Sequence, residues 1–218
     1  MNRLSTGSTL LDGLLCGGYE TDILTAIYGP ASSGKTTMCL MAAVVVAKTG
    51  KKVIFVDSEG GFSGERFEQL GSLELLKSVF ILKPTNFQMQ AKLIESLKSM
   101  INEKIGLVVV DTISMLYRVE MGKEKNKHMN NEMSIQLSYL TEITRLNNIP
   151  VIQTSQVYSD FEKKDAVKMV GGDLIRYASK CQIELQKHDT QRKAILRTHR
   201  SIEENKEVCF KIMEKGIC

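Results

Sequence analysis

One short glycine-rich motif, placed between two apolar stretches, constrains the fold of this chain more than any other feature. It reads GPASSGKT over residues 29–36 and follows an apolar run at 23–28, which predicts a buried strand. Residues 36–48 follow as a predicted helix. Three consecutive valines at 44–46 would alone favour a strand, but their position directly after the motif favours the helix. A strand, a tight loop and a helix in this order begin an α/β unit.

The same alternation continues along the chain. Apolar runs at 53–57, 79–82, 107–111 and 151–154 predict further strands, with helices at 85–101 and 131–146 between them. Thr85 and Gln88 form a capping-box pair that predicts the start of the first of these helices. Beyond residue 170, runs at 182–185 and 194–197 predict an antiparallel hairpin, and 208–212 predicts one more strand.

This pattern predicts an α/β fold with a mostly parallel, twisted sheet flanked by helices and antiparallel edge strands near the C-terminus. With 43% hydrophobic and 25% charged residues, the composition excludes disordered and fibrous classes. The net charge of +4 is too small to indicate a nucleic-acid partner by itself. No repeat, low-complexity tract or proline-rich linker divides residues 1–218, so we expect a single domain.

The composition also bears on the cellular compartment. The N-terminal residues lack the apolar core of a signal peptide, and the longest apolar run, 38–47, is far shorter than the roughly 20 residues that span a bilayer. The five cysteines are scattered, without a CxxC pair or a histidine at metal-ligand spacing. We therefore expect a cytoplasmic protein with reduced thiols, no structural zinc and no membrane partner.

The glycine-rich motif matches the P-loop pattern G-x-x-x-x-G-K-[ST]. Its glycines let backbone N–H groups point at phosphate oxygens, and the positive end of the following helix dipole favours the same anion. Lys35 can reach the β- and γ-phosphates, and the Thr36 hydroxyl can bind Mg²⁺. The predicted cofactor-binding residues are Gly29, Pro30, Ala31, Ser32, Ser33, Gly34, Lys35, Thr36 and Thr37.

Three carboxylates follow predicted strands. Asp111 ends the run 107–111 and can hold Mg²⁺ across from the P-loop, so the predicted metal ligands are Thr36 and Asp111; a merely solvated strand end is the alternative. Asp57 and Glu59 follow a strand expected beside the P-loop strand, and either can orient or deprotonate an attacking water. Spacing alone does not choose between them, and each could equally be a surface carboxylate.

Several further motifs, together with the P-loop, resemble the RecA/RadA recombinase family over nearly the whole chain, most closely its short archaeal members. They are Thr6-Gly7, Leu11-Asp12, Leu14-Leu15, Gly17-Gly18 before Glu20, VDSE at 56–59, VVVD at 108–111, TSQV at 154–157 and VGGD at 170–173. The resemblance implies a RecA-type P-loop NTPase core that uses ATP and Mg²⁺. It assigns Glu59 to water activation and Gln156 to sensing the γ-phosphate, which gives a catalytic set of Glu59, Lys35 and Gln156. Without the resemblance, Gln156 reads as a polar residue that caps a strand end.

In this family the loops after the Asp111 strand and after Gln156 face DNA, and here they correspond to 117–130 and 158–170. Clustered cations give sequence-independent, salt-sensitive affinity for phosphates, and exposed aromatic rings, here Tyr117, Tyr158 and Phe161, can stack on bases. The alternative is a solvated loop, because acidic residues dilute the charge. The basic stretch 187–200 is either a binding edge or an exposed hairpin protected against aggregation. The predicted DNA-binding residues are Arg118, Lys123, Lys125, Lys127, Lys163, Lys164 and Lys168.

The chain also departs from the full recombinases. It starts almost at the ATPase core, so we expect neither an N-terminal helical DNA-binding domain nor the linker that joins recombinase subunits into filaments, and the loop after Gln156 is shortened. Both features argue against independent filament formation and strand exchange. The resemblance therefore implies a weakly hydrolysing, ATP-binding accessory of homologous recombination and DNA repair. It would bind single- and double-stranded DNA near the nucleoid and assist the main archaeal recombinase RadA. Holliday-junction-processing proteins and a second copy of the chain are further candidate partners. The alternatives are a RecA-fold signalling ATPase and an ATP-gated protein-interaction module, both without DNA binding.

Overall fold

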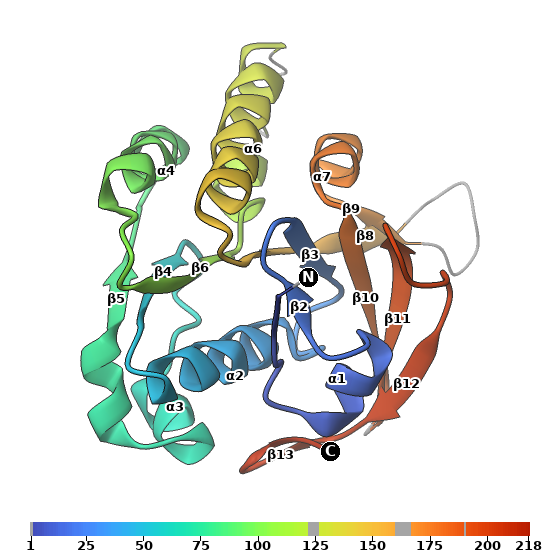
Figure 1. Cartoon of the computed structure of the whole chain (residues 1–218). Coiled ribbons are helices and arrows are strands. Elements are labelled where there is room, and N and C mark those ends of the chain that lie inside the picture. The colour runs from blue at the N-terminus through green and yellow to red at the C-terminus, as the bar shows by residue number, and fades with distance from the viewer. Residues whose placement is uncertain (1, 122–126, 160–166, 190) are drawn as a thin grey trace.

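A computed structural model describes residues 2–121, 127–159, 167–189 and 191–218. Its core is an eight-stranded sheet in the order β12-β11-β10-β3-β7-β6-β4-β5 (Figure 1). Strands β10, β3, β7, β6, β4 and β5 pair in parallel, and β11 and β12 are antiparallel to their neighbours, as the sequence pattern predicts. The strands are β3 (Leu24–Tyr28), β4 (Lys52–Asp57), β5 (Val79–Leu82), β6 (Ile105–Asp111), β7 (Val151–Ser155), β10 (Cys181–His188), β11 (Gln191–His199) and β12 (Glu207–Phe210).

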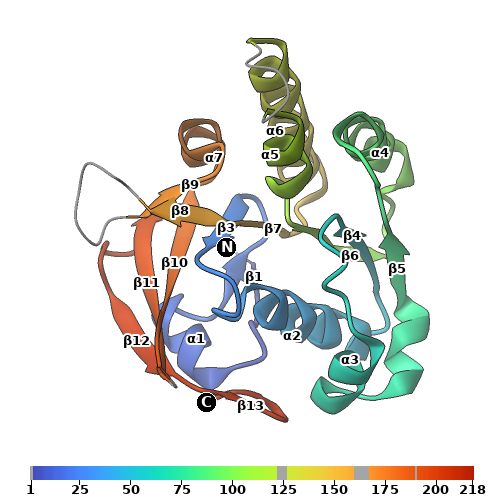
Figure 2. The same ribbon diagram turned by 180° about the vertical axis from the view of Figure 1, so that it is seen from behind.

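Helices cover both faces of this sheet, so each face has its own hydrophobic core (Figures 1 and 2). Alternate residues of β4 serve the two cores: Val53 and Phe55 pack with α2, whereas Ile54 and Val56 pack with α4 and α6. One face carries α1 (Thr9–Leu14), α2 (Lys35–Lys48) and α3 (Gly64–Leu70). The other carries α4 (Phe87–Met100), α5 (Met115–Met121), α6 (Lys127–Asn147) and α7 (Gly172–Ala178).

The helix boundaries show where local sequence signals succeed and fail. Helix α2 forms at the predicted place, and α6 begins four residues earlier than predicted. The capping-box prediction at Thr85 was wrong: Asn86 is the N-cap of α4, because its Oδ1 accepts a hydrogen bond of 2.8 Å from the Met89 backbone N–H. Thr85 Oγ1 instead lies 3.8 Å from Met89 Sδ.

Several short elements were not predicted from the sequence pattern. Besides α1, α3, α5 and α7, they are β1 (Arg3–Leu4), β2 (Tyr19–Glu20), η1 (Leu73–Ser78), β8 (Val157–Ser159), β9 (Val167–Met169), β13 (Ile212–Met213) and β14 (Gly216–Ile217). The predicted strand 208–212 is interrupted, with β12 ending at Phe210 and β13 beginning at Ile212. These elements are too short to show a period in the sequence.

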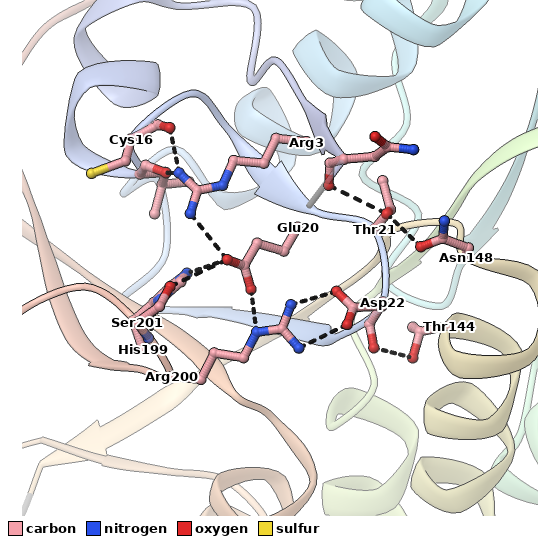
Figure 3. A network of polar contacts seen from close by, with 12 residues as sticks. Arg3, Cys16, Glu20, Thr21, Asp22, Thr144, Asn148, His199, Arg200 and Ser201 are labelled. Carbon is pink, nitrogen blue, oxygen red and sulfur yellow. Dashed lines mark hydrogen bonds and ion pairs between the residues drawn. The ribbon is translucent and has the colours of Figure 1, made fainter.

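A buried carboxylate, Glu20, links the two-stranded β1–β2 sheet to Arg200, the residue that follows β11 (Figure 3). Its Oε1 lies 3.0 Å from Arg3 Nη2, and its Oε2 lies 2.6 Å from Arg200 Nε. Arg200 also donates to both oxygens of Asp22, at 2.6 and 2.7 Å, and this bond holds the pKa of Asp22 below its usual range. Ion pairing and hydrogen bonding offset the cost of burying the Glu20 charge.

Candidate nucleotide-binding site

The candidate site lies where the carboxyl ends of β3, β4, β6 and β7 meet, the usual ligand edge of an open parallel sheet. The P-loop joins β3 to α2 there, and Gly34 adopts a left-handed conformation with φ of 112° at the N-cap of α2. A cavity of about 430 Å³ opens beside the loop. It is lined by Ala31, Ser32, Gly34, Lys35, Thr36, Thr37, Glu59, Arg192 and Ile212.

Most of the predicted cofactor-binding residues face this cavity, and the remaining three shape the loop. Gly29 has no room for a side chain, because a Cβ there would lie 2.4 Å from the Leu185 carbonyl oxygen. Ser33 is fully buried. The carbonyl oxygens of Gly29 and Pro30 each accept a hydrogen bond of 2.9 Å from Lys35 Nζ. Burial lowers the pKa of Lys35, and the nearby carboxylates of Glu59 and Asp111 oppose that effect.

The two predicted metal ligands are in direct contact. Thr36 Oγ1 donates a hydrogen bond of 2.6 Å to Asp111 Oδ2, and Thr154 Oγ1 donates to Asp111 Oδ1. Burial raises the pKa of Asp111, and these two hydroxyl donors partly counteract the rise. A hydroxyl and a single carboxylate are hard oxygen ligands of the kind that fits Mg²⁺ shared with phosphates. Within the described residues no group of three or more His, Cys, Asp or Glu side chains forms a metal cage.

The structure separates the two carboxylates that sequence spacing left equivalent. Asp57 is buried, and its two oxygens accept hydrogen bonds from the backbone N–H groups of Gly61 and Phe62, at 2.9 and 3.3 Å. It therefore holds the turn after β4. Glu59 is exposed and lines the cavity. Of the two carboxylates, Glu59 is the one that lines the cavity.

Gln156 follows the last residue of β7 and connects two other side chains. Its Nε2 donates a hydrogen bond of 2.7 Å to Glu59 Oε1, and its Oε1 accepts one of 3.3 Å from Arg118 Nη1. Glu59, Gln156 and Lys35 are predicted to form one catalytic set, and all three lie around this edge of the sheet. The contact with Arg118 was not foreseen.

The predicted DNA-binding residues are only partly visible. Arg118 is an exposed residue of α5, and the exposed Lys127 begins α6. The prediction of a loop over 117–130 was therefore wrong at both ends of this segment, which are helical. The backbone of Lys168 belongs to β9, opposite Tyr158 of β8. Lys123, Lys125, Lys163 and Lys164 lie outside the described residues, as do the side chain of Lys168 and the aromatic residue Phe161.

One predicted stacking residue is corrected by the structure. Tyr117 is only 5% exposed, its hydroxyl donates to Asn130 Oδ1, and its ring packs edge-on against Phe87. It is therefore part of the core and not a stacking surface. Tyr158, in contrast, is 49% exposed and remains available.

Arg192 is a site residue that sequence reasoning missed. It belongs to β11, lines the P-loop cavity and donates from Nε to the Ser32 carbonyl oxygen at 3.1 Å. Its only sequence signal was its place in the basic stretch 187–200, which gave no reason to place it beside the P-loop. Ile212 of β13 was missed for the same reason: both positions depend on how the C-terminal strands return to the sheet.

Comparison with known proteins identifies the family. The sequence pattern of the Rad51 family matches residues 1–218. The chain belongs to the Rad51 family, in its archaeal RadB branch. DNA repair and recombination protein RadB of Methanobrevibacter smithii is 39% identical to it, over 99% of this chain and 95% of that protein. RadB of Thermococcus kodakarensis is also 39% identical, over 98% of each.

A solved structure supports the same assignment. The crystal structure of the RadB recombinase superposes with a TM-score of 0.86 at 39% identity, covering 98% of both chains. The RecA-type fold that the motifs implied is therefore confirmed. Among the described residues, no helix combines the length and apolar character needed to cross a membrane.

Proposed function

We propose that this chain is an ATP-responsive DNA-binding accessory of homologous recombination and DNA repair. Membership of the Rad51 family, with relatives named DNA repair and recombination protein RadB, supports the biological process. The observation that carries the proposal is the double contact of Gln156. The side-chain amide of Gln156 contacts Glu59 at the nucleotide cavity and Arg118 on α5, within the segment 117–130 that is predicted to face DNA. The Gln156 side chain would therefore respond both to a nucleotide in the cavity and to DNA bound at Arg118.

Of the residues proposed to hold ATP and Mg²⁺, Lys35 and Thr36 line the cavity, and Asp111 is hydrogen-bonded to Thr36. Lys35 Nζ would exchange two neutral carbonyl acceptors for charged phosphate oxygens, which form stronger hydrogen bonds. Thr36 and Asp111 would hold the metal, which when bound neutralises charge on the phosphates. Arg192 adds a further cation to the cavity wall.

Glu59 is the proposed acceptor of the proton of the attacking water, because it is an exposed carboxylate at the cavity. Its Oε1 already accepts a hydrogen bond from Gln156, so we expect slow hydrolysis until that bond is exchanged. A γ-phosphate would compete with Glu59 for the Gln156 amide, since both are anionic acceptors. This competition is the proposed sensing step.

The DNA-binding cations are proposed to be Arg118 and Lys127, together with Lys123, Lys125, Lys163, Lys164 and Lys168 of the segments 117–130 and 158–170. They would contact phosphates and confer sequence-independent, salt-sensitive affinity. We further propose that residues 1–218 act as one RecA-type domain and that the protein works in the cytoplasm on nucleoid DNA. Its proposed protein partners are the recombinase RadA, Holliday-junction-processing proteins and a second copy of the chain.

Salt-titrated DNA binding, with and without ATP and Mg²⁺, tests this proposal. We expect affinity for a fluorescent oligonucleotide to fall steeply with salt, and ATP to change it by about five-fold or more. Lys127→Ala should reduce the salt slope by about one. Arg145→Ala, which removes the same charge from the distant end of α6, is the matched control and should bind as the wild type does.

The result also separates the competing functions. A signalling ATPase or an ATP-gated interaction module would bind ATP and show no salt-dependent DNA binding at any nucleotide state. That outcome would show that the proposed DNA binding is wrong, and the proposed nucleotide site would still stand. A DNA affinity equal with and without ATP would remove only the response to ATP.

A further inference from the structure

We propose that Arg118 is a positioning residue that restrains Glu59 through Gln156 and releases it on binding a polynucleotide phosphate. The inference rests on the proposed function, because it concerns the same ATP site and names how DNA would regulate it. Arg118 does not line the nucleotide cavity. It acts through a chain of two hydrogen bonds, from its own Nη1 to Gln156 Oε1 and from Gln156 Nε2 to Glu59 Oε1.

The two hydrogen bonds reinforce each other. The Arg118 cation draws electron density toward the amide oxygen, which makes the amide N–H a better donor to the Glu59 carboxylate. In this arrangement Glu59 is held by the amide, and the oxygen that accepts this hydrogen bond is not available to a water molecule.

The backbone that carries Gln156 and Arg118 is held by its own hydrogen bonds, so we expect only the side chains to change partners. Ser114 and Ser155 are fully buried, and their hydroxyl oxygens lie 3.0 Å apart. Ser114 Oγ accepts a hydrogen bond of 3.3 Å from the Gln156 backbone N–H, and the Ser114 carbonyl accepts one of 3.0 Å from the Arg118 backbone N–H. The two bonds of the Ser114 hydroxyl tie the residue before α5 to the end of β7, and the third bond ties Arg118 to Ser114. Glu59, Gln156 and Arg118 can therefore exchange partners without moving the strands.

A polynucleotide phosphate is a better partner for Arg118 than the amide oxygen it now contacts. The Arg118 side chain is exposed, and among the described residues no carboxylate forms an ion pair with it. A guanidinium binds phosphate through two parallel charge-assisted hydrogen bonds, whereas its bond to Gln156 is a single contact of 3.3 Å to a neutral oxygen. Phosphate binding would therefore free Gln156, and with it Glu59.

The first test follows the hydrogen bonds of Gln156 to Arg118 and Glu59, in the absence of nucleotide. The side-chain amide of Gln156 is followed by NMR while a single-stranded oligothymidine is added to the nucleotide-free protein. In the wild type the amide signal should move on titration. In Arg118→Ala it should start at a different position and no longer respond, while Arg145→Ala should respond as the wild type does. A Gln156 signal that responds equally in wild type and Arg118→Ala would overturn the inference.

The second test reads the consequence for Glu59 by single-turnover hydrolysis. Arg118→Ala loses the hydrogen bond to Gln156, so its hydrolysis rate without DNA should be about five-fold above that of the wild type. DNA should not stimulate this variant further. Arg118→Lys keeps the charge and one donor, so its DNA-free rate should lie below that of Arg118→Ala. An Arg118→Ala rate at or below the wild-type rate would contradict the restraint, as would equal rates for the lysine and alanine variants.

The outcomes distinguish this inference from the proposed function. If the wild type binds DNA in an ATP-dependent way and Arg118→Ala keeps the wild-type basal rate and stimulation, only the inference fails. If the wild type binds no DNA, the proposed function fails, and the coupling fails with it. Equal melting temperatures of the variants by circular dichroism exclude a folding defect as the cause of either result.

Discussion

At the scale of single residues, the site depends on which carboxylate lines the cavity and which is taken up by backbone N–H groups. Spacing could not choose between Asp57 and Glu59, because the choice is made by the backbone turn that ends at Phe62 and uses both oxygens of Asp57. Arg118 and Arg192 were likewise invisible as partners of Gln156 and the P-loop, since those contacts join segments 38 and 160 residues apart. The P-loop residues, in contrast, could be assigned from their local motif alone.

Asp111 gives a prediction about pH. Its pKa is raised in the folded protein, so the folded state favours the protonated carboxyl; the corresponding stability is present at low pH and is lost as the pH rises through the raised pKa. Asp111→Asn should therefore melt at a higher temperature than the wild type at pH 7.5, without nucleotide. The difference should narrow on acidification, which calorimetry at several pH values measures.

The melting temperature of the same variant can also be measured with ATP and Mg²⁺. Adding ATP and Mg²⁺ should raise the melting temperature of the wild type more than that of Asp111→Asn, because the amide is a poor ligand for a hard cation. An asparagine variant that melts lower than the wild type at every pH would show that the charged carboxylate stabilises the fold, against this account.

At the scale of elements, the longer strands and helices followed from periodicity, but their ends did not. Helix α2 is buried around nearly its whole circumference, so it has no polar face and its valine run resembles a strand. Its position directly after the P-loop is the feature that predicts a helix there. Helices α5 and α7 are only seven residues long and gave no sequence signal, although α5 carries Arg118.

The cap of α4 provides a test at this scale. Asn86→Ala removes the side-chain acceptor for the Met89 N–H and should lower the free energy of unfolding by about 1 kcal/mol. Thr85→Ala, one residue earlier, should change it by only a few tenths of that. Urea denaturation followed by circular dichroism compares the two. A larger loss for Thr85→Ala would restore the capping-box prediction and contradict the observed cap.

At the scale of the whole molecule, the sheet order assembles the site from distant parts of the sequence. The P-loop, Glu59, Asp111, Gln156 and Arg192 come from the ends of five different strands or their following turns. The α/β class and the antiparallel C-terminal edge could be predicted, because strand periods and the order of motifs are local properties. The return of β11 and β13 to the P-loop could not, because it depends on tertiary packing.

The central claim is that the P-loop cavity binds ATP through Lys35. Calorimetric titration of a non-hydrolysable ATP analogue with Mg²⁺ tests it most directly, because heat is measured without turnover or DNA. We predict a single ATP-binding site in the wild type and an affinity at least about ten-fold weaker in Lys35→Ala. The variant lacks the ammonium group that would exchange its hydrogen bonds to the Gly29 and Pro30 carbonyls for stronger bonds to phosphate. No binding in the wild type, or equal affinity in the variant, would contradict the account.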